Sequence, residues 1–176
     1  MPVSIRTLHS NEIARAIVLQ EGDVGIVYGR LPHPAIHDEL VATGRLVCVA
    51  KAGPRGADRR TTVELQEVLR GPFIRIDERD PLGAALADQW SRRGLAPRAG
   101  MTVQTHHITM VMAEQGFGPA IIDSFTARAI PTDTLHVRAL LPEIPVEVRA
   151  LIPQGLRSPR PVADFIAAFR KATERR

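Results

Sequence analysis

The sequence predicts an α/β protein built from two lobes, each with parallel strands covered by helices. Short apolar runs bounded by glycine or proline, which are typical of buried strands, alternate with segments that carry apolar residues at helical spacing. This alternation restarts at Pro72, as expected if a second lobe is inserted into the first. The length of 176 residues and the 44% hydrophobic content suffice for such a core.

The first lobe is expected to open with a strand and a helix. Residues 2–8 alternate imperfectly between apolar and polar side chains and predict the strand, and Ser10 is placed to cap the helix that follows. The apolar run within 22–29, between glycines, predicts a strand buried on both faces, and 45–50 predicts another. A capped helix is expected over 61–69.

The second lobe is expected to repeat this pattern. A strand over 73–76 is followed by a helix over 80–93 that ends before Gly94. A brief strand at 101–103 and a helix over 105–115 come next, before a buried strand at 119–122. The remaining chain adds two extended runs and a closing helix, at 135–141, 146–152 and 159–170.

Composition excludes several classes of protein. The net charge of +4 comes from basic residues scattered along the chain, which favours a solvated surface over a phosphate-binding patch. With one Trp and one Tyr, the chain offers little for stacking on bases. The lone Cys48 cannot form an internal disulfide, and neither an export signal nor a membrane span is present in the sequence. A reducing cytoplasm is therefore expected.

No motif for catalysis, metal or cofactor binding stands out. His33 and His37 have metal-ligand spacing, but Pro34 interrupts it and no further ligands accompany them. The glycines at 116 and 118 lack the third glycine of a dinucleotide fingerprint, and no serine lies in a nucleophile elbow. We expect neither an enzyme nor a metal or cofactor site.

A ligand site is expected where helices begin beyond the carboxyl ends of strands, because unpaired N–H groups and the helix dipole are exposed there. Tyr28 follows the strand predicted within 22–29 and offers a hydroxyl, although a glycine-bounded surface turn explains it as well. Arg79 lies before the helix at 80–93 and could pair with an acidic ligand. The alternative is that Arg79 pairs with Asp77 or Asp80.

Two further places carry polar groups in this pattern. Gln104, Thr105, His106 and His107 open the next predicted helix, where the alternative to ligand binding is helix capping and surface histidines. Asp123 follows a buried strand and could accept a hydrogen bond from an amino or guanidino group. A plain Asx turn is the alternative.

Six stretches, taken in order, cover most of the chain and resemble the effector-binding part of LysR-type transcriptional regulators. They include an acidic turn that leads into an apolar strand and a Gly-x-Gly segment before a buried strand. The stretches are residues 21–27, 46–50, 69–74, 94–97, 115–122 and 158 with 162–169.

The resemblance implies two Rossmann-like lobes around an effector cleft, as in type II periplasmic binding proteins. Lobe I would comprise residues 1–69 and 144–176, and lobe II would comprise 70–143. The winged helix-turn-helix, the linker helix, and the strand and helix that open the family's effector domain have no counterpart in the sequence. The chain is therefore expected to reach DNA only through such a segment, and to form a homo-oligomer that covers the open edge of lobe I.

The resemblance also implies site chemistry. Residues 104–107 lie where the family contacts its effector, and His107 stands where a small hydroxyl residue is common. Asp123 begins a stretch similar to that of relatives responding to opines and amino-acid derivatives, except that Ser124 replaces a proline. The expected ligand is a small anionic or zwitterionic metabolite. A solute-binding protein or an enzyme on the same fold is the alternative.

Overall fold

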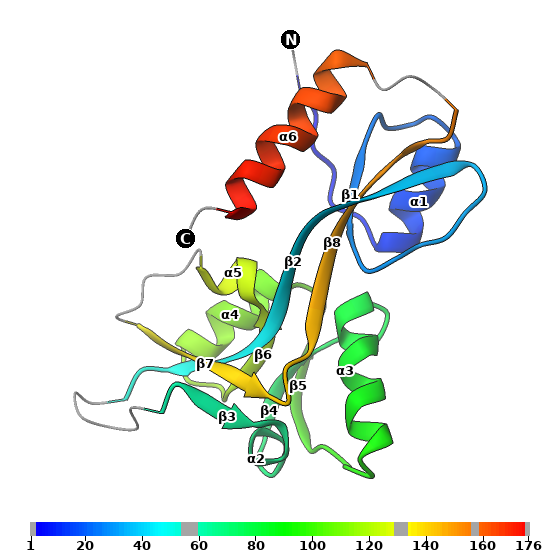
Figure 1. Ribbon diagram of the computed structural model, residues 1–176. Helices are drawn as coiled ribbons and strands as arrows, with labels where there is room; N and C mark the ends of the chain where they lie inside the picture. The colour runs from blue at the N-terminus through cyan, green and yellow to red at the C-terminus, as the bar shows by residue number, and fades with distance from the viewer. Residues whose placement is uncertain (1–2, 54–59, 129–133, 156–158, 175–176) are drawn as a thin grey trace. The chain divides into compact units, whose positions relative to one another are not determined.

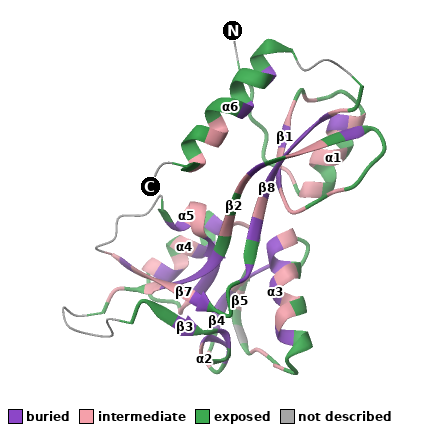
Figure 2. Cartoon of the chain, viewed as in Figure 1, coloured by how far each residue is buried: buried purple, intermediate pink, exposed green. Residues whose placement is uncertain are grey.

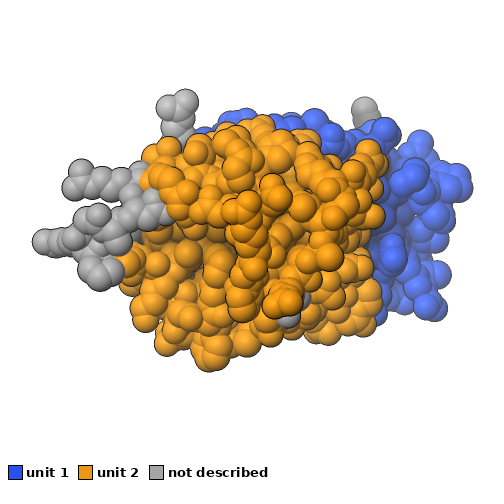
Figure 3. Space-filling view, turned by 90° about the horizontal axis from the view of Figure 1, so that it is seen from below, with its two compact units in different colours: residues 1–43, 147–175 blue, residues 44–146, 176 orange. Residues whose placement is uncertain are grey.

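The computed structural model describes residues 3–53, 60–128, 134–155 and 159–174. Contacts within the chain group it into two compact units, which Figure 3 colours separately. Unit 1 contains residues 1–43 and 147–175, and unit 2 contains 44–146 together with the C-terminal residue. Two strands, β2 and β8, run from one unit into the other (Figure 1); they span Ile36–Lys51 and Pro145–Pro153.

Unit 1 is a small sheet against which two helices pack, each through its own apolar cluster. Its elements besides β2 and β8 are α1 (Ser10–Val18), β1 (Gly25–Tyr28) and α6 (Arg160–Glu174). β1 pairs antiparallel with β8. One cluster joins Ile17 of α1 to Val27 of β1, and the other joins Val162 and Ile166 of α6 to the sheet. Figure 2 shows that most of the rest of α6 is exposed.

The start of unit 1 differs from the sequence prediction. Residues 3–9 form no strand, and Val3 and Ile5 are 71% and 85% exposed. The cap of α1 is His9 rather than Ser10, in a capping box with Glu12. Residue 2 of the predicted strand and residue 158 of the family resemblance lie outside the described residues.

Unit 2 is a larger sheet with helices packed against it. Three of its strands are parallel neighbours in the order β6-β4-β5, while β2 pairs antiparallel with both β6 and β7, and β3 runs parallel to β7. Apolar runs buried on both faces do not encode strand direction, so the parallel pairing expected throughout occurs only in part. The elements are β3 (Thr62–Glu64), α2 (Leu65–Leu69), β4 (Phe73–Ile76), α3 (Pro81–Arg92), β5 (Ala99–Val103), α4 (His106–Glu114), β6 (Ala120–Asp123), α5 (Ser124–Arg128) and β7 (Leu135–Leu141).

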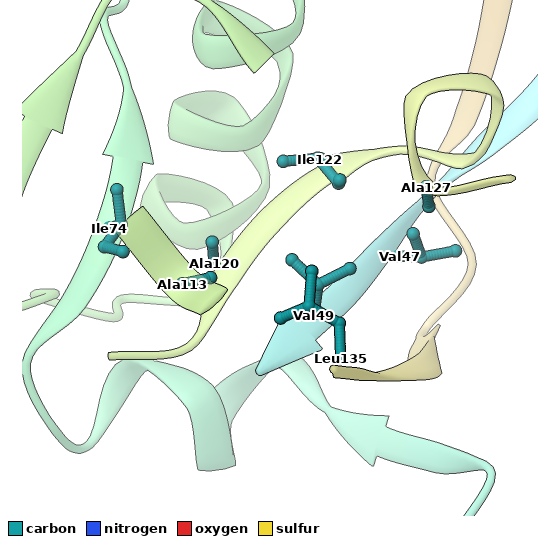
Figure 4. Close-up of a cluster of buried hydrophobic side chains, with 8 residues drawn as sticks. All are labelled: Val47, Val49, Ile74, Ala113, Ala120, Ile122, Ala127 and Leu135. Atoms are coloured by element: carbon teal, nitrogen blue, oxygen red, sulfur yellow. The ribbon is translucent and has the colours of Figure 1, made fainter. Parts of the chain in front are cut away.

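One apolar core cluster of unit 2 lies between the sheet and α4 and α5 (Figure 4). Val49 of β2, Ile74 of β4 and Ile122 of β6 are fully buried there and meet Ala113 of α4 and Ala127 of α5. Small residues on the helices and branched residues on the strands allow close packing. Truncating one of these branched side chains to alanine costs about 2–5 kcal/mol in comparable cores.

The observed units and the expected lobes divide the chain at different residues. Residues 44–69 fall within unit 2, because β3 pairs with β7 and the C-terminal half of β2 pairs with β6. The lobe boundaries after residues 69 and 143 stay a prediction. Within the described part of the chain, no helix combines the length and the apolar character that crossing a membrane requires.

Candidate functional site

Polar segments follow the carboxyl ends of three neighbouring parallel strands in unit 2. Residues 77–80 follow β4, residues 104–107 follow β5, and Asp123 is the last residue of β6. Because these strands are parallel, their carboxyl ends share one edge of the sheet. Most of the residues predicted for the site therefore belong to this edge.

His106 connects the three segments. It is the first residue of α4, and its buried imidazole lies between two carboxylates. The Nδ1 atom lies 3.1 Å from Oδ2 of Asp123, and the Nε2 atom lies 3.8 Å from Oδ1 of Asp80. The first distance is that of a hydrogen bond, while the second is too long for one but short enough for charge attraction.

The protonation state of His106 follows from these neighbours. Burial alone disfavours a charged ring, but the carboxylates of Asp123 and Asp80 outweigh burial and raise the pKa of His106 to about 9. Burial also disfavours a charged Asp123, yet the hydrogen bonds from His106 and Thr126 hold its pKa below the ordinary value. The Asp123 backbone N–H lies 3.3 Å from Nδ1, a contact that only a neutral ring would accept. We assign the imidazolium, which donates to the carboxylate.

Both carboxylates also cap helices. Asp80 Oδ1 accepts hydrogen bonds from the backbone N–H groups of Leu82 and Gly83, at 2.8 and 3.4 Å, at the start of α3. Asp123 Oδ1 accepts from Phe125 and Thr126, at 2.9 and 2.7 Å, at the start of α5. The starts of α3 and α5 are thus each occupied by a carboxylate of the protein itself.

The start of α4 is different, because its cap is a neutral hydroxyl. Thr105 Oγ1 accepts from the backbone N–H of Ile108 at 3.3 Å, and the Thr105 carbonyl accepts from the hydroxyl of Thr109 at 2.9 Å. Gln104 and His107, on either side of the cap, are exposed. Among the three helix starts described at this edge, α4 alone begins without a carboxylate cap.

Arg79 is exposed and is held by its own loop. Its guanidinium donates to Asp77 at 2.8 and 3.0 Å, and its backbone N–H donates to the same carboxylate at 2.9 Å. This hydrogen bonding lowers the pKa of Asp77 and raises that of Arg79. The pairing left open in the sequence analysis is therefore present, and a ligand-binding role for Arg79 stays a prediction.

Tyr28 belongs to unit 1. It is the half-buried last residue of β1, opposite Val148 of β8. Its role as a ligand contact stays a prediction, as do those of Gln104, Thr105, His106, His107 and Asp123.

Sequence reasoning missed the contact between His106 and Asp80. The two residues lie 26 positions apart on different helices, so no local spacing relates them. The available signal was Asp80 before Pro81, an N-cap pattern that places a carboxylate at the same sheet edge as His106. Within the described residues, no group of three or more His, Cys, Asp or Glu side chains could hold a metal ion.

Comparisons with known proteins agree with this architecture. The family model of the LysR substrate binding domain matches residues 1–174. The HTH-type transcriptional regulator DgcR of Pseudoalteromonas sp. is 26% identical over 150 residues, which are 84% of this chain and 50% of DgcR. The chain thus spans half the length of that curated relative.

Solved structures show the same fold. The CcmR regulatory domain of Synechocystis PCC6803, in complex with 2-PG, superposes with a TM-score of 0.80 at 13% identity, covering 98% of this chain and 84% of that domain. The effector binding domain of QuiR, in complex with shikimate, gives a TM-score of 0.73 at 14% identity, covering 92% and 78%. The predicted α/β fold, of the type II periplasmic-binding kind, is confirmed. The chain belongs to the LysR substrate-binding domain family, whose members serve as the effector-binding domains of LysR-type transcriptional regulators.

Proposed function

We propose that this chain senses a small anionic or zwitterionic metabolite, such as an organic acid or an amino-acid derivative, at the start of α4. The observation that carries the proposal is the difference among the three helix starts. Asp80 and Asp123 occupy the starts of α3 and α5, whereas the start of α4 has a neutral cap at Thr105. A ligand carboxylate can take the place that a protein carboxylate takes at the other two helices.

The electrostatics of the edge support an anion at this position. N–H groups in the first turn and the helix dipole favour a negative charge by about 0.3–2 kcal/mol. The carboxylates of Asp123, which is buried, and Asp80, which is half-buried, do not cancel this preference, because the His106 imidazolium and the N–H groups of α3 and α5 offset their charge. Gln104 and His107 are exposed beside the cap and supply donors and acceptors that orient the ligand.

The proposed role is binding rather than chemical transformation. CcmR and QuiR, which share the fold, carry small molecules in their structures. DgcR is a transcriptional regulator about twice the length of the matched region. We infer that this chain acts as the sensor of such a regulator, that DNA is reached through a winged helix-turn-helix outside this sequence, and that the chain associates with further copies of itself. An effector can shift the regulator only by its difference in affinity for two conformations.

The proposal is tested by a thermal-shift screen with matched compounds. Organic acids and amino acids are compared with their primary amides at the same concentration and ionic strength. We expect one or a few carboxylates to raise the melting temperature while their amides do not, since a binder at 100 times its Kd stabilises by about 2.7 kcal/mol. Equal stabilisation by acid and amide, or by cationic amines instead, would contradict an anion site.

A further inference from the structure

The crossover strand β2 makes a close contact with α5 at the point where it enters unit 2. Gly44 is the first residue of this unit on β2. A Cβ atom at Gly44 would lie 2.7 Å from both Ser124 Oγ and Phe125 Cε2, closer than real Cβ atoms come to their neighbours. The next residue, Arg45, donates its backbone N–H to Ser124 Oγ at 3.3 Å. The absence of a side chain at Gly44 thus lets the strand rest directly on the start of α5.

The start of α5 is held in turn by the buried histidine. Asp123 binds the N–H groups of Phe125 and Thr126 through Oδ1 and binds His106 through Oδ2. A continuous set of contacts therefore leads from the first residue of α4 to the crossover strand. Every step in it is a hydrogen bond or a direct packing contact inside unit 2.

We propose that His106 and Asp123 are positioning residues that couple the start of α4 to Gly44 and Arg45 of β2 through the first turn of α5. A close-packed contact cannot absorb a small displacement, so a movement of Ser124 and Phe125 is passed to the strand backbone.

The coupling also reaches the second crossover strand. The Arg45 guanidinium donates to Glu143 at 3.1 Å, and the backbone N–H of Leu46 donates to the carbonyl of Ile144 at 2.9 Å. Glu143 and Ile144 directly precede β8. A shift of Arg45 in β2 is therefore passed to Glu143 and Ile144, which lead into β8.

A role for this coupling in ligand sensing rests on the proposed function. The coupling itself can be tested without a ligand. Protonation of His106 serves as the perturbation. The charged groups placed against its ring are Asp80, at the cap of α3, and Asp123 of β6. Arg75 of β4 donates its side-chain hydrogen bonds to Glu78 and Thr102. Failure of the ligand screen and failure of the coupling are therefore separate outcomes.

The experiment is a pH titration of the ¹⁵N-labelled 176-residue chain by NMR. The His106 ring resonances report its protonation, and the amide resonances of Gly44 and Arg45 report the strand. We expect both amides to shift with the same midpoint as the His106 ring. Amides that stay flat through the His106 transition, or that follow a different midpoint, would overturn the proposal.

Variants distinguish coupling through the first turn of α5 from a general change in structure. Ser124→Ala removes the acceptor of the Arg45 amide, so the Arg45 response should fall at least threefold while the His106 ring still titrates. An unchanged Arg45 response in this variant would contradict the route through α5. His106→Gln is expected to shift the Gly44 and Arg45 amides severalfold more than His37→Gln, which alters an exposed histidine on the same strand. Equal effects of the two histidine variants would also contradict the coupling. If His106→Gln fails to fold, the titration of the wild-type chain alone tests the proposal.

Discussion

The Nδ1 atom of His106 lies 3.1 Å from the Asp123 carboxylate and thereby joins the first residue of α4 to the last residue of β6. Asp123 is fully buried and also caps α5. Removing its charge takes the closer carboxylate away from the imidazolium, since Asp80 lies at 3.8 Å, and weakens the cap.

We therefore expect Asp123→Asn to lower the free energy of unfolding by about 3 kcal/mol, the magnitude typical of a broken buried ion pair. Urea denaturation followed by circular dichroism measures the loss. Asp88→Asn is the matched control, because Asp88 pairs with Arg92 on the exposed side of α3. It should leave the midpoint almost unchanged, and equal losses in the two variants would argue against a structural role for the buried pair.

The same pair predicts how stability depends on pH. The pKa of His106 is raised from 6.5 to about 9, so its contribution is complete below pH 6.5 and is lost as the pH rises through about 9. The pKa of Asp123 is lowered from 3.8, so its contribution is present above that value and is lost in acid. The difference in unfolding free energy between wild type and His106→Gln should thus be largest near pH 4–6.5 and shrink by pH 9–10. A difference that grows with pH would contradict the imidazolium assignment.

Two glycines of unit 2 should respond differently to replacement by alanine. A Cβ at Gly83 in α3 would lie 2.2 Å from the Asp77 carbonyl oxygen, whereas a Cβ at Gly71 would meet nothing within 4 Å. Gly83→Ala should therefore destabilise by about 2 kcal/mol or more, because it pushes α3 away from the loop after β4. Gly71→Ala should be neutral or slightly stabilising. Chemical denaturation of both variants checks this, and equal effects would contradict the close packing.

Cys48 should be chemically inert in the folded protein. Its thiol is fully buried in β2, and burial raises its pKa although Arg138 partly offsets the effect. We expect a thiol reagent to modify the native chain slowly and the urea-unfolded chain rapidly. Because Cys48 is the one cysteine of the sequence, the label reports on this strand alone. Rapid modification without denaturant would show that β2 opens readily in unit 2.

The sequence predicts the elements that have strong local signals. β4 is observed over the predicted residues, and the Asp-Pro pair at 80–81 places the start of α3. By contrast, the sequence carries no signal for α5, because five residues after Asp123 are too few to show helical periodicity. The Asx-type hydrogen bond offered as the alternative at Asp123 is present, from the backbone N–H of Phe125. The strand predicted over residues 2–8 failed because an alternating pattern forms a strand only where a partner strand exists.

The sequence predicts where the polar residues of the candidate site lie, but not which of them contact one another. The rule that ligand sites follow the carboxyl ends of strands selected Tyr28, Arg79, residues 104–107 and Asp123. The structure places the last three at one sheet edge of unit 2 and Tyr28 in unit 1. The pairing of carboxylates with cations depends on the strand order, and a single sequence does not reveal that order. The position of His106 between Asp80 and Asp123 is of this kind.

The central claim, that a carboxylate ligand binds at the start of α4, is tested most directly by calorimetric titration of a carboxylate selected in the thermal-shift screen. Wild type is compared with Thr105→Ala, His107→Ala and the control His37→Ala, after each variant is shown to be folded. We predict that affinity falls at least tenfold, about 1.4 kcal/mol, in the first two variants and stays unchanged in the control. Unchanged affinity in both Thr105→Ala and His107→Ala would contradict the site.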